Sequence, residues 1–288
     1  MIANKFVRDP RRTDRVPTVQ PVRNNSSADT SYDATTEVYN HIQKHWYLHY
    51  PVSLRLLRAS LEKVGDTSMK VVITGSTGYL GQQVLRQCLL SPSITSIVSI
   101  SRRDPGVLDE KLEVILHNDF SQYPPDILSR IQDAQACIYC LGTNIPVKPA
   151  KLNRKINFEY ALTTARTFAA FERSRPFHFV YLSGALVEKD MEKRLWFLAD
   201  NRRMRGELEN SLLHLDSERH NKGFKIFIAR PGFVQPQGAV LRTWLIGCVA
   251  NAIMISDFAI AMVHLALQGH DQTLVENTQL KDIASLGL

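Results

Sequence analysis

Three glycines at intervals of three residues carry the clearest chemical signal in this sequence. Gly75, Gly78 and Gly81 lie in "ITGSTGYLG", directly after a short apolar run and at the start of a helical pattern. The first permits a tight turn, the second lets backbone approach a pyrophosphate, and the third lets the helix pack closely on a sheet. N–H groups at the helix N-terminus then face the phosphates. The stretch therefore predicts a dinucleotide site. Its expected cofactor contacts are Gly75, Thr77, Gly78, Tyr79, Leu80 and Gly81.

The residues after the next apolar run bear on which dinucleotide is bound. An Asp or Glu about 20 residues past the glycines would hold the ribose hydroxyl of NAD. This chain has Ser101, Arg102 and Arg103 at that distance, and the first acid is Asp104. Because a guanidinium can hold a phosphate through two parallel hydrogen bonds, the sequence favours NADP over NAD. The alternative is that an arginine here is a solvated loop charge.

Segments typical of strands and of helices alternate from Met69 onward. We expect strands at residues 70–74, 93–101, 112–119, 134–142, 177–184 and 224–232. We expect helices at 78–91, 126–133, 153–174 and 200–220, and a last one from Ser256 or Asp257 to a C-cap at Gly269. The alternation predicts an α/β fold, a doubly wound parallel sheet of the Rossmann-like kind with helices on both faces.

The residues before this fold carry no chemical motif. Residues 1–35 are polar and basic, and we expect a disordered tail there. Residues 36–68 are interpreted either as a helical docking or targeting segment or as an extension outside the functional protein. Residues 69–288 are expected to form the nucleotide-binding domain, with a small C-terminal substrate lobe. Asp9 and Asp14 argue against a mitochondrial presequence, so we expect a cytoplasmic location, with mitochondrial targeting as the alternative.

Composition and cysteine positions exclude several functions. The chain has 288 residues, a net charge of +7 and four cysteines. The basic excess is too mild to indicate nucleic-acid binding, and it suits an anionic small ligand. Cys137 and Cys140 lie on one predicted strand, where residues three apart point to opposite faces, so no metal site is expected. Asp257 interrupts the apolar stretch 244–267, which is therefore interpreted as two buried elements and not as an integral membrane segment.

Several short motifs, in this order, resemble one family. The stretches "VVITGSTGYLG", "SRR", "HNDF", "CLGT", "INFEYALTTA", "YLSGA" and "IARPG" are similar to those of atypical short-chain dehydrogenase/reductases. The tail "ISDFAIAMVHLALQGHDQTLVENTQLKDIA" resembles the branch containing the Tat-interacting oxidoreductase-like proteins. The resemblance covers residues 69–288. It implies an NADP(H)-dependent oxidoreductase acting on a small carbonyl or alcohol substrate.

The resemblance also implies roles for single residues. One residue would contact the adenine, three at the end of the fourth strand would pass the nicotinamide ribose, and two would lie beside the carboxamide. In that order these expected cofactor contacts are Asp119, Leu141, Gly142, Thr143, Pro231 and Gly232. Ser183 in "YLSGA" would hydrogen-bond the substrate carbonyl. Plainer interpretations are a helix cap for Asp119, a satisfied strand-end hydroxyl for Ser183, and a simple turn for the Pro-Gly pair.

The catalytic Tyr-x-x-x-Lys pair of that family is absent. This chain has no tyrosine after Tyr181, and its best match, "DNRRMRGELE", has Asn201 at the tyrosine position and Arg205 at the lysine position. Arg205 could hold ribose hydroxyls and phosphate, but it is no acid or base near neutral pH. Asn201 cannot donate a catalytic proton. Ser183, Asn201 and Arg205 are therefore the candidate catalytic residues of a degenerate active site.

Three interpretations of function stay open. The first is an NADP-dependent oxidoreductase whose proton comes from Ser183, water or the substrate. The second is a non-catalytic NADP(H)-binding regulatory or scaffold protein with a protein partner. The third, a nucleotide-sugar epimerase or dehydratase, suffers most from the absent tyrosine. A Tyr, His or Glu within hydrogen-bond distance of Ser183 would favour catalysis, and Tyr160 and His178 are the first candidates.

Overall fold

The structure is a computed structural model that describes residues 68–143, 145–184, 187–188, 199–219, 222–236 and 251–287. The expectations for residues 1–35 and 36–67, and for the first part of the apolar stretch 244–267, lie outside these described residues. Everything described belongs to one compact unit of the chain.

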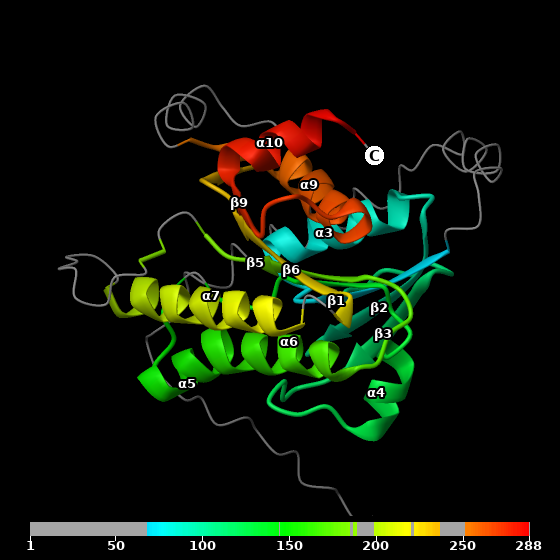
Figure 1. Cartoon of the computed structure of the whole chain (residues 1–288), viewed down its shortest axis with the longest axis horizontal. Coiled ribbons are helices and arrows are strands. Elements are labelled where there is room, and N and C mark those ends of the chain that lie inside the picture. The colour runs from blue at the N-terminus through cyan, green and yellow to red at the C-terminus, as the bar shows by residue number, and fades with distance from the viewer. Residues whose placement is uncertain are drawn as a thin grey trace, which may run out of the picture. The chain divides into compact units, whose positions relative to one another are not determined.

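A seven-stranded parallel sheet forms the middle layer (Figure 1). Its strands are β1 (Met69–Thr74), β2 (Ile94–Ser101), β3 (Leu112–Leu116), β4 (Ala136–Tyr139), β5 (Phe177–Leu182), β6 (Phe224–Arg230) and β9 (Leu274–Glu276). They are ordered β3-β2-β1-β4-β5-β6-β9, so the chain reverses its direction of winding between β1 and β4. The expected doubly wound parallel sheet is confirmed. A short pair, β7 (Val234–Gln235) and β8 (Ile253–Met254), lies apart from it.

Helices cover both faces of the sheet, as the alternation predicts (Figure 1). One face carries α4 (Pro125–Ile131), α6 (Tyr160–Ala170) and α7 (Ala199–Arg219). The other carries α3 (Tyr79–Leu90), α9 (Ile255–Gln268) and α10 (Asn277–Ser285). Because each face is buried, the strands need apolar side chains on both sides, which explains their nearly continuous hydrophobic runs.

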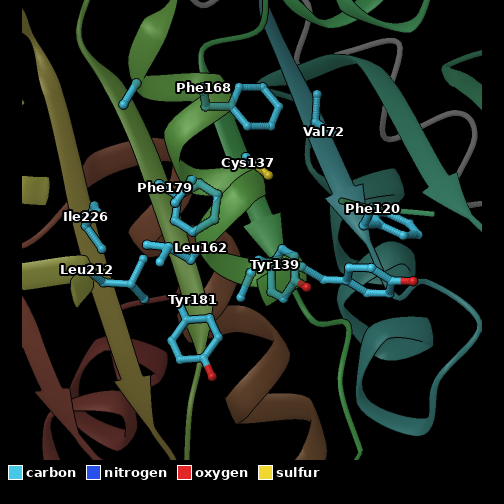
Figure 2. Packing of buried hydrophobic residues seen from close by; sticks show 14 of the residues in the cluster. Val72, Phe120, Cys137, Tyr139, Leu162, Phe168, Phe179, Tyr181, Leu212 and Ile226 are labelled. Carbon is cyan, nitrogen blue, oxygen red and sulfur yellow. The ribbon is translucent and has the colours of Figure 1, made fainter. Parts of the chain in front are cut away.

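Alternation along the strands divides the core into two clusters. Cys137, Tyr139, Phe179 and Tyr181 point to the α6–α7 face (Figure 2), whereas Cys140 packs on the opposite cluster. The first cluster is rich in aromatic rings, some of them stacked with centroids 5.0 and 5.7 Å apart. Burying one such large apolar side chain contributes about 1.5–3 kcal/mol. The apolar clusters on the two faces therefore stabilise the sheet that carries the loops at its C-terminal edge.

Two helices differ from the sequence expectation. The expected helix at 153–174 is α5 (Ala150–Arg154), a π-helical turn, η1 (Lys155–Glu159), and α6, and it ends early because Phe171 adopts an extended conformation. The N-cap expected at Ser256 or Asp257 is wrong. Helix α9 begins at Ile255 with Met254, which has an extended conformation, as its N-cap, so Ser256 and Asp257 already lie inside the helix.

The C-terminal end of α9 is as expected. Gly269 has φ 72° and its N–H donates to Leu265 O at 3.1 Å, which is a glycine C-cap. Among the described residues, no helix combines the length and the apolar composition that crossing a bilayer requires.

Candidate nucleotide site and catalytic centre

The three glycines form a turn at the point where the sheet changes its winding direction. Gly75 has φ 72°, and a Cβ there would lie 2.6 Å from the backbone of Cys140 and Leu141 at the end of β4. The Gly78 N–H donates to Gly75 O at 2.9 Å, which closes the turn. A Cβ on Gly81 would overlap that same carbonyl. Gly75 and Gly81 are therefore required for a close backbone approach, whereas a Cβ on Gly78 would lie 3.2 Å from Gly75 O.

The start of α3 offers the features that a pyrophosphate needs. Its N-cap is Gly78, and no side chain caps the helix N-terminus. Helix N-termini carry partial positive charge and outward-pointing N–H groups. Nucleotides in doubly wound folds bind at the C-terminal ends of the strands where the order reverses, which here is the end of β1 beside β4. The backbone geometry thus fits a dinucleotide at Gly75, Gly78 and Gly81.

Two arginines follow β2 on the side of the site where the adenosine ribose is expected. Arg102 and Arg103 are both exposed. Ser101 is buried, and its hydroxyl donates to Arg103 O at 2.6 Å. The structure therefore leaves the guanidinium groups accessible to a ligand but commits the serine hydroxyl to the backbone.

Asp119 has partners of its own. Its carboxylate accepts the Ser121 N–H at 3.2 Å and lies 3.2 Å from Lys155 Nζ. The hydrogen bonds from Ser121, followed by that from Lys155, lower the pKa of Asp119 to about 2. Lys155 belongs to the π-helical turn, so this contact ties the loop after β3 to η1. The carboxylate therefore stays ionised and is anchored to η1 through Lys155.

Asparagines hold the two loops that are expected beside the nicotinamide. The Thr143 N–H donates to Asn157 Oδ1 at 2.7 Å, and a Cβ on Gly142 would lie 3.2 Å from the same oxygen. The Gly232 N–H donates to Asn277 Oδ1 at 2.7 Å. Sequence reasoning missed both asparagines. A signal was present in each case. Asn157 lies inside a predicted helix, where asparagine is unfavourable. Asn277 directly follows the Glu of the "LVEN" segment.

The three candidate catalytic side chains each have an internal partner. The Ser183 hydroxyl donates to Glu209 Oε1 at 2.6 Å. Asn201 is buried and its Oδ1 accepts from Asn153 Nδ2 at 2.7 Å. Arg205 Nη2 donates to the Thr143 carbonyl at 3.2 Å. Ser183 directly follows β5, Arg205 reaches the carbonyl of Thr143 beyond the end of β4, and Asn201 contacts α5 through Asn153.

Neither Tyr160 nor His178 is the hydrogen-bond partner of Ser183. His178 lies at the other end of β5, where its Nδ1 donates to Ala266 O at 3.0 Å. Tyr160 packs against Phe120, with ring centroids 5.7 Å apart. The partner is the carboxylate of Glu209, which sequence reasoning did not single out although the family-like "GELE" stretch contains it.

Glu209 belongs to a buried ion pair. Its side chain is fully buried and both of its oxygens accept from Arg230, through Nε at 2.9 Å and through Nη2. Arg230 also pairs with Glu276 at 2.8 Å. Hydrogen bonds to Glu209 and then Glu276, together with their charges, raise the pKa of Arg230. The network fixes the end of β6 against α7 and β9.

No family model matches the chain. Among curated proteins, the mitochondrial protein fmp52-2 of Neosartorya fischeri is 25% identical over 237 residues, which cover 77% of this chain and 97% of that protein. The leucinostatins biosynthesis cluster protein T of Purpureocillium lilacinum is 25% identical over 188 residues, 65% of each chain. This chain therefore spans just under two thirds of the latter relative.

Solved structures with a similar fold bind nicotinamide nucleotides. A short-chain dehydrogenase of Burkholderia cenocepacia in complex with NADP superposes with a TM-score of 0.57 at 16% identity, covering 76% of this chain and 92% of that one. The Bordetella bronchiseptica enzyme WbmF in complex with NAD+ gives 0.56 at 12% identity, covering 76% and 77%. With its seven parallel strands and glycine turn, the chain has a Rossmann fold similar to that of these two structures.

Proposed function

We propose that this protein binds NADP(H) and is an oxidoreductase acting on a small carbonyl or alcohol. The observation that carries the proposal is the glycine turn, in which Gly75, Gly78 and Gly81 bring the backbone of β1, β4 and α3 together at the point where the strand order reverses. Bound there, a nicotinamide supplies or accepts a hydride. The dehydrogenase and WbmF structures support a nicotinamide cofactor in general.

The preference for NADP is supported by the two exposed arginines. Arg102 and Arg103 follow β2, where the ribose 2′ position is expected, and a 2′-phosphate would replace water around their guanidinium groups. An acid that would repel that phosphate first appears at Asp104, whose carboxylate instead accepts the Gly106 N–H at 2.7 Å. The Asp104 carboxylate is therefore bound to the backbone of its own turn at 104–106.

Slow turnover is part of the proposal. None of Ser183, Asn201 and Arg205 offers an acidic proton near neutral pH, and general acid catalysis contributes about 10²–10⁴-fold. The same observation favours a second candidate function, an NADP(H)-binding protein without catalysis that a protein partner would recognise. Turnover of aldehydes by the nucleotide-bound protein separates the two, since even slow reduction that exceeds the uncatalysed rate excludes the purely binding role.

We also propose a mitochondrial location in preference to the cytoplasm. The support is the description of the fmp52 relatives as mitochondrial, one of them matching over 97% of its length. Fractionation of cells expressing the tagged full chain tests this, and a cytoplasmic distribution contradicts it.

Isothermal titration with NADPH and NADH tests the nucleotide proposal. We expect NADPH to bind at least about tenfold more tightly, which corresponds to about 1.4 kcal/mol. Arg102→Gln should remove most of that preference, whereas Arg166→Gln, an exposed arginine on α6, provides a matched control and should leave it unchanged. Binding of neither nucleotide refutes the proposed function, and equal binding of both refutes the NADP preference alone.

A further inference from the structure

Three buried asparagines form a chain beside the site. Asn153 in α5, Asn157 in η1 and Asn201 in the first turn of α7 are only 8%, 7% and 6% exposed. An ion pair holds their helices in register, since Arg154 Nη1 and Nη2 donate to the two oxygens of Glu207 at 2.9 and 2.6 Å. Asn201 stands at the position of the missing tyrosine. The row of hydrogen-bonded asparagines therefore ends where the substrate oxygen is expected.

Backbone donors fix the orientation of every amide in the chain. The Thr143 N–H can only donate, so the Asn157 atom 2.7 Å from it is the oxygen, and Asn157 Nδ2 then faces Asn153. Asn153 Oδ1 accepts both that Nδ2, at 2.9 Å, and the Val147 N–H, at 3.1 Å. Asn153 Nδ2 must therefore donate to Asn201, and the Asn201 atom that accepts, at 2.7 Å, must be Oδ1. Each step leaves one possible orientation.

The amide of Asn201, the last of the three asparagines, has its two Nδ2 hydrogens available for a ligand. Within the described part of the chain, Asn201 makes a hydrogen bond only through Oδ1, which accepts from Asn153 Nδ2 at 2.7 Å. The Ser183 hydroxyl, by contrast, donates its hydrogen to Glu209. Of the two uncharged candidate catalytic side chains, Asn201 is therefore the one with N–H groups to offer.

We propose that Asn201 Nδ2 donates a hydrogen bond to the carbonyl oxygen of the substrate, with Asn153 and Asn157 as positioning residues that fix the direction of its amide. The proposal rests on the proposed function and deepens it. A reduced nicotinamide nucleotide held at Gly75, Gly78 and Gly81 would supply a hydride to the carbonyl carbon, which would form the C–H bond and move the π pair onto oxygen. Asn201 stabilises the resulting alkoxide, and water supplies the proton. The substrate class is thus a carbonyl compound, bound through a hydrogen-bond acceptor.

Preorganised donors of this kind matter because charge develops on the oxygen during the reaction. Removal of one such donor typically costs about 10²–10³-fold in turnover, even though the donor transfers no proton. Asn201 needs no reorganisation, since Asn153 holds its oxygen and the backbone holds Asn153. The arrangement accounts for a site that has lost its tyrosine but retains a polar group aimed at the same place.

The substitution Asn153→Asp should reverse the orientation of the Asn201 amide without replacing Asn201 itself. One aspartate oxygen still accepts the Val147 N–H and Asn157 Nδ2, while the other faces Asn201 and can only accept. Asn201 then turns its Nδ2 inward and leaves its oxygen outward. Lys151→Gln changes the net charge of α5 by the same amount at an exposed position and is the matched control.

The experiment is NMR of the full chain with 15N-labelled asparagine side chains, with the Asn201 signal identified by its loss in Asn201→Asp. In wild type and Lys151→Gln, we expect the Asn201 amide protons to exchange rapidly with water in the nucleotide-free protein. In protein saturated with NADP+, cyclohexanone should shift that signal. Asn153→Asp should slow the exchange at least about tenfold and abolish the cyclohexanone shift. A structural asparagine without a ligand role would not respond to cyclohexanone.

A protected Asn201 amide in wild type, an unchanged amide in Asn153→Asp, or no cyclohexanone shift in wild type overturns the proposal. If Asn153→Asp does not fold, Asn201→Asp decides, because it keeps an acceptor toward Asn153 and aims a carboxylate oxygen outward. Saturation-transfer NMR should then show at least a tenfold loss of cyclohexanone affinity, and unchanged affinity overturns the proposal. A rapidly exchanging amide in a protein that binds no nucleotide by titration refutes the proposed function alone.

Discussion

Gly81→Ala tests whether close packing of α3 on the turn creates the nucleotide site. The added Cβ would overlap Gly75 O and lie 2.8 Å from Gly75 C, where real Cβ contacts stay beyond 3.0 Å. Both neighbours are backbone atoms, so no side chain can move away, and the first turn of α3 must withdraw by about 1 Å. Overpacking of this kind costs about 1–3 kcal/mol. For a domain of this size that corresponds to a melting temperature lower by about 2–12 °C.

Gly78→Ala is the matched variant, because its Cβ would lie 3.2 Å from the same Gly75 oxygen. Gly78 also has an ordinary extended conformation, with φ −81° and ψ 160°. We therefore expect its melting temperature to stay within about 2 °C of wild type. Its NADPH affinity should still fall at least about tenfold, because the methyl group occupies the space in which a pyrophosphate approaches the backbone.

Circular dichroism melts and isothermal titration with NADPH measure the two effects separately. Gly81→Ala should lose both stability and nucleotide affinity, whereas Gly78→Ala should lose affinity alone. If Gly81→Ala melts and binds as wild type does, the close approach of α3 to the turn is not required. If Gly78→Ala binds NADPH normally, the phosphates do not lie against this backbone.

Two further predictions concern stability. Arg230→Met should destabilise the fold by about 3–5 kcal/mol in urea unfolding, because it leaves the buried Glu209 carboxylate without its cation; the double variant with Glu209→Leu should recover part of the loss, and equal losses would contradict this account. Burial lowers the pKa of His178, so the unfolded chain binds the proton more readily, and stability should fall as pH drops below about 6.5. His178→Asn, which keeps a donor for Ala266 O, should flatten that dependence between pH 7 and 5.5, and an unchanged slope would show that burial of this ring is not its source.

The sheet and the glycine turn could be predicted because their causes are local in sequence. Apolar runs alternating with helical patterns specify a parallel sheet with two covered faces, whatever the contacts between distant residues. The turn needs glycine at Gly75 because its φ is 72°, and that requirement can be recognised from three glycines and a strand. The π-helical turn at 155–159 was not predicted, since its sequence is as compatible with an ordinary helix.

The partners of the candidate catalytic residues could not be predicted, because they lie far away in the sequence. Ser183 and Glu209 are 26 residues apart, and Asn153 and Asn201 are 48 apart. Residue types alone allowed Ser183 to face a substrate or to be satisfied at a strand end. Only packing of α7 against β6, the strand beside β5, brings Glu209 against its hydroxyl.

The sequence by itself determined that this chain folds as a doubly wound α/β domain with a backbone turn suited to a dinucleotide, and that no tyrosine follows Tyr181 to serve as a proton donor. The tertiary structure decided which way the amide of Asn201 points. That direction depends on N–H groups of Thr143 and Val147, transmitted through hydrogen bonds between side chains of separate elements. A carboxamide has a donor end and an acceptor end, and only its neighbours in space determine which end a substrate meets.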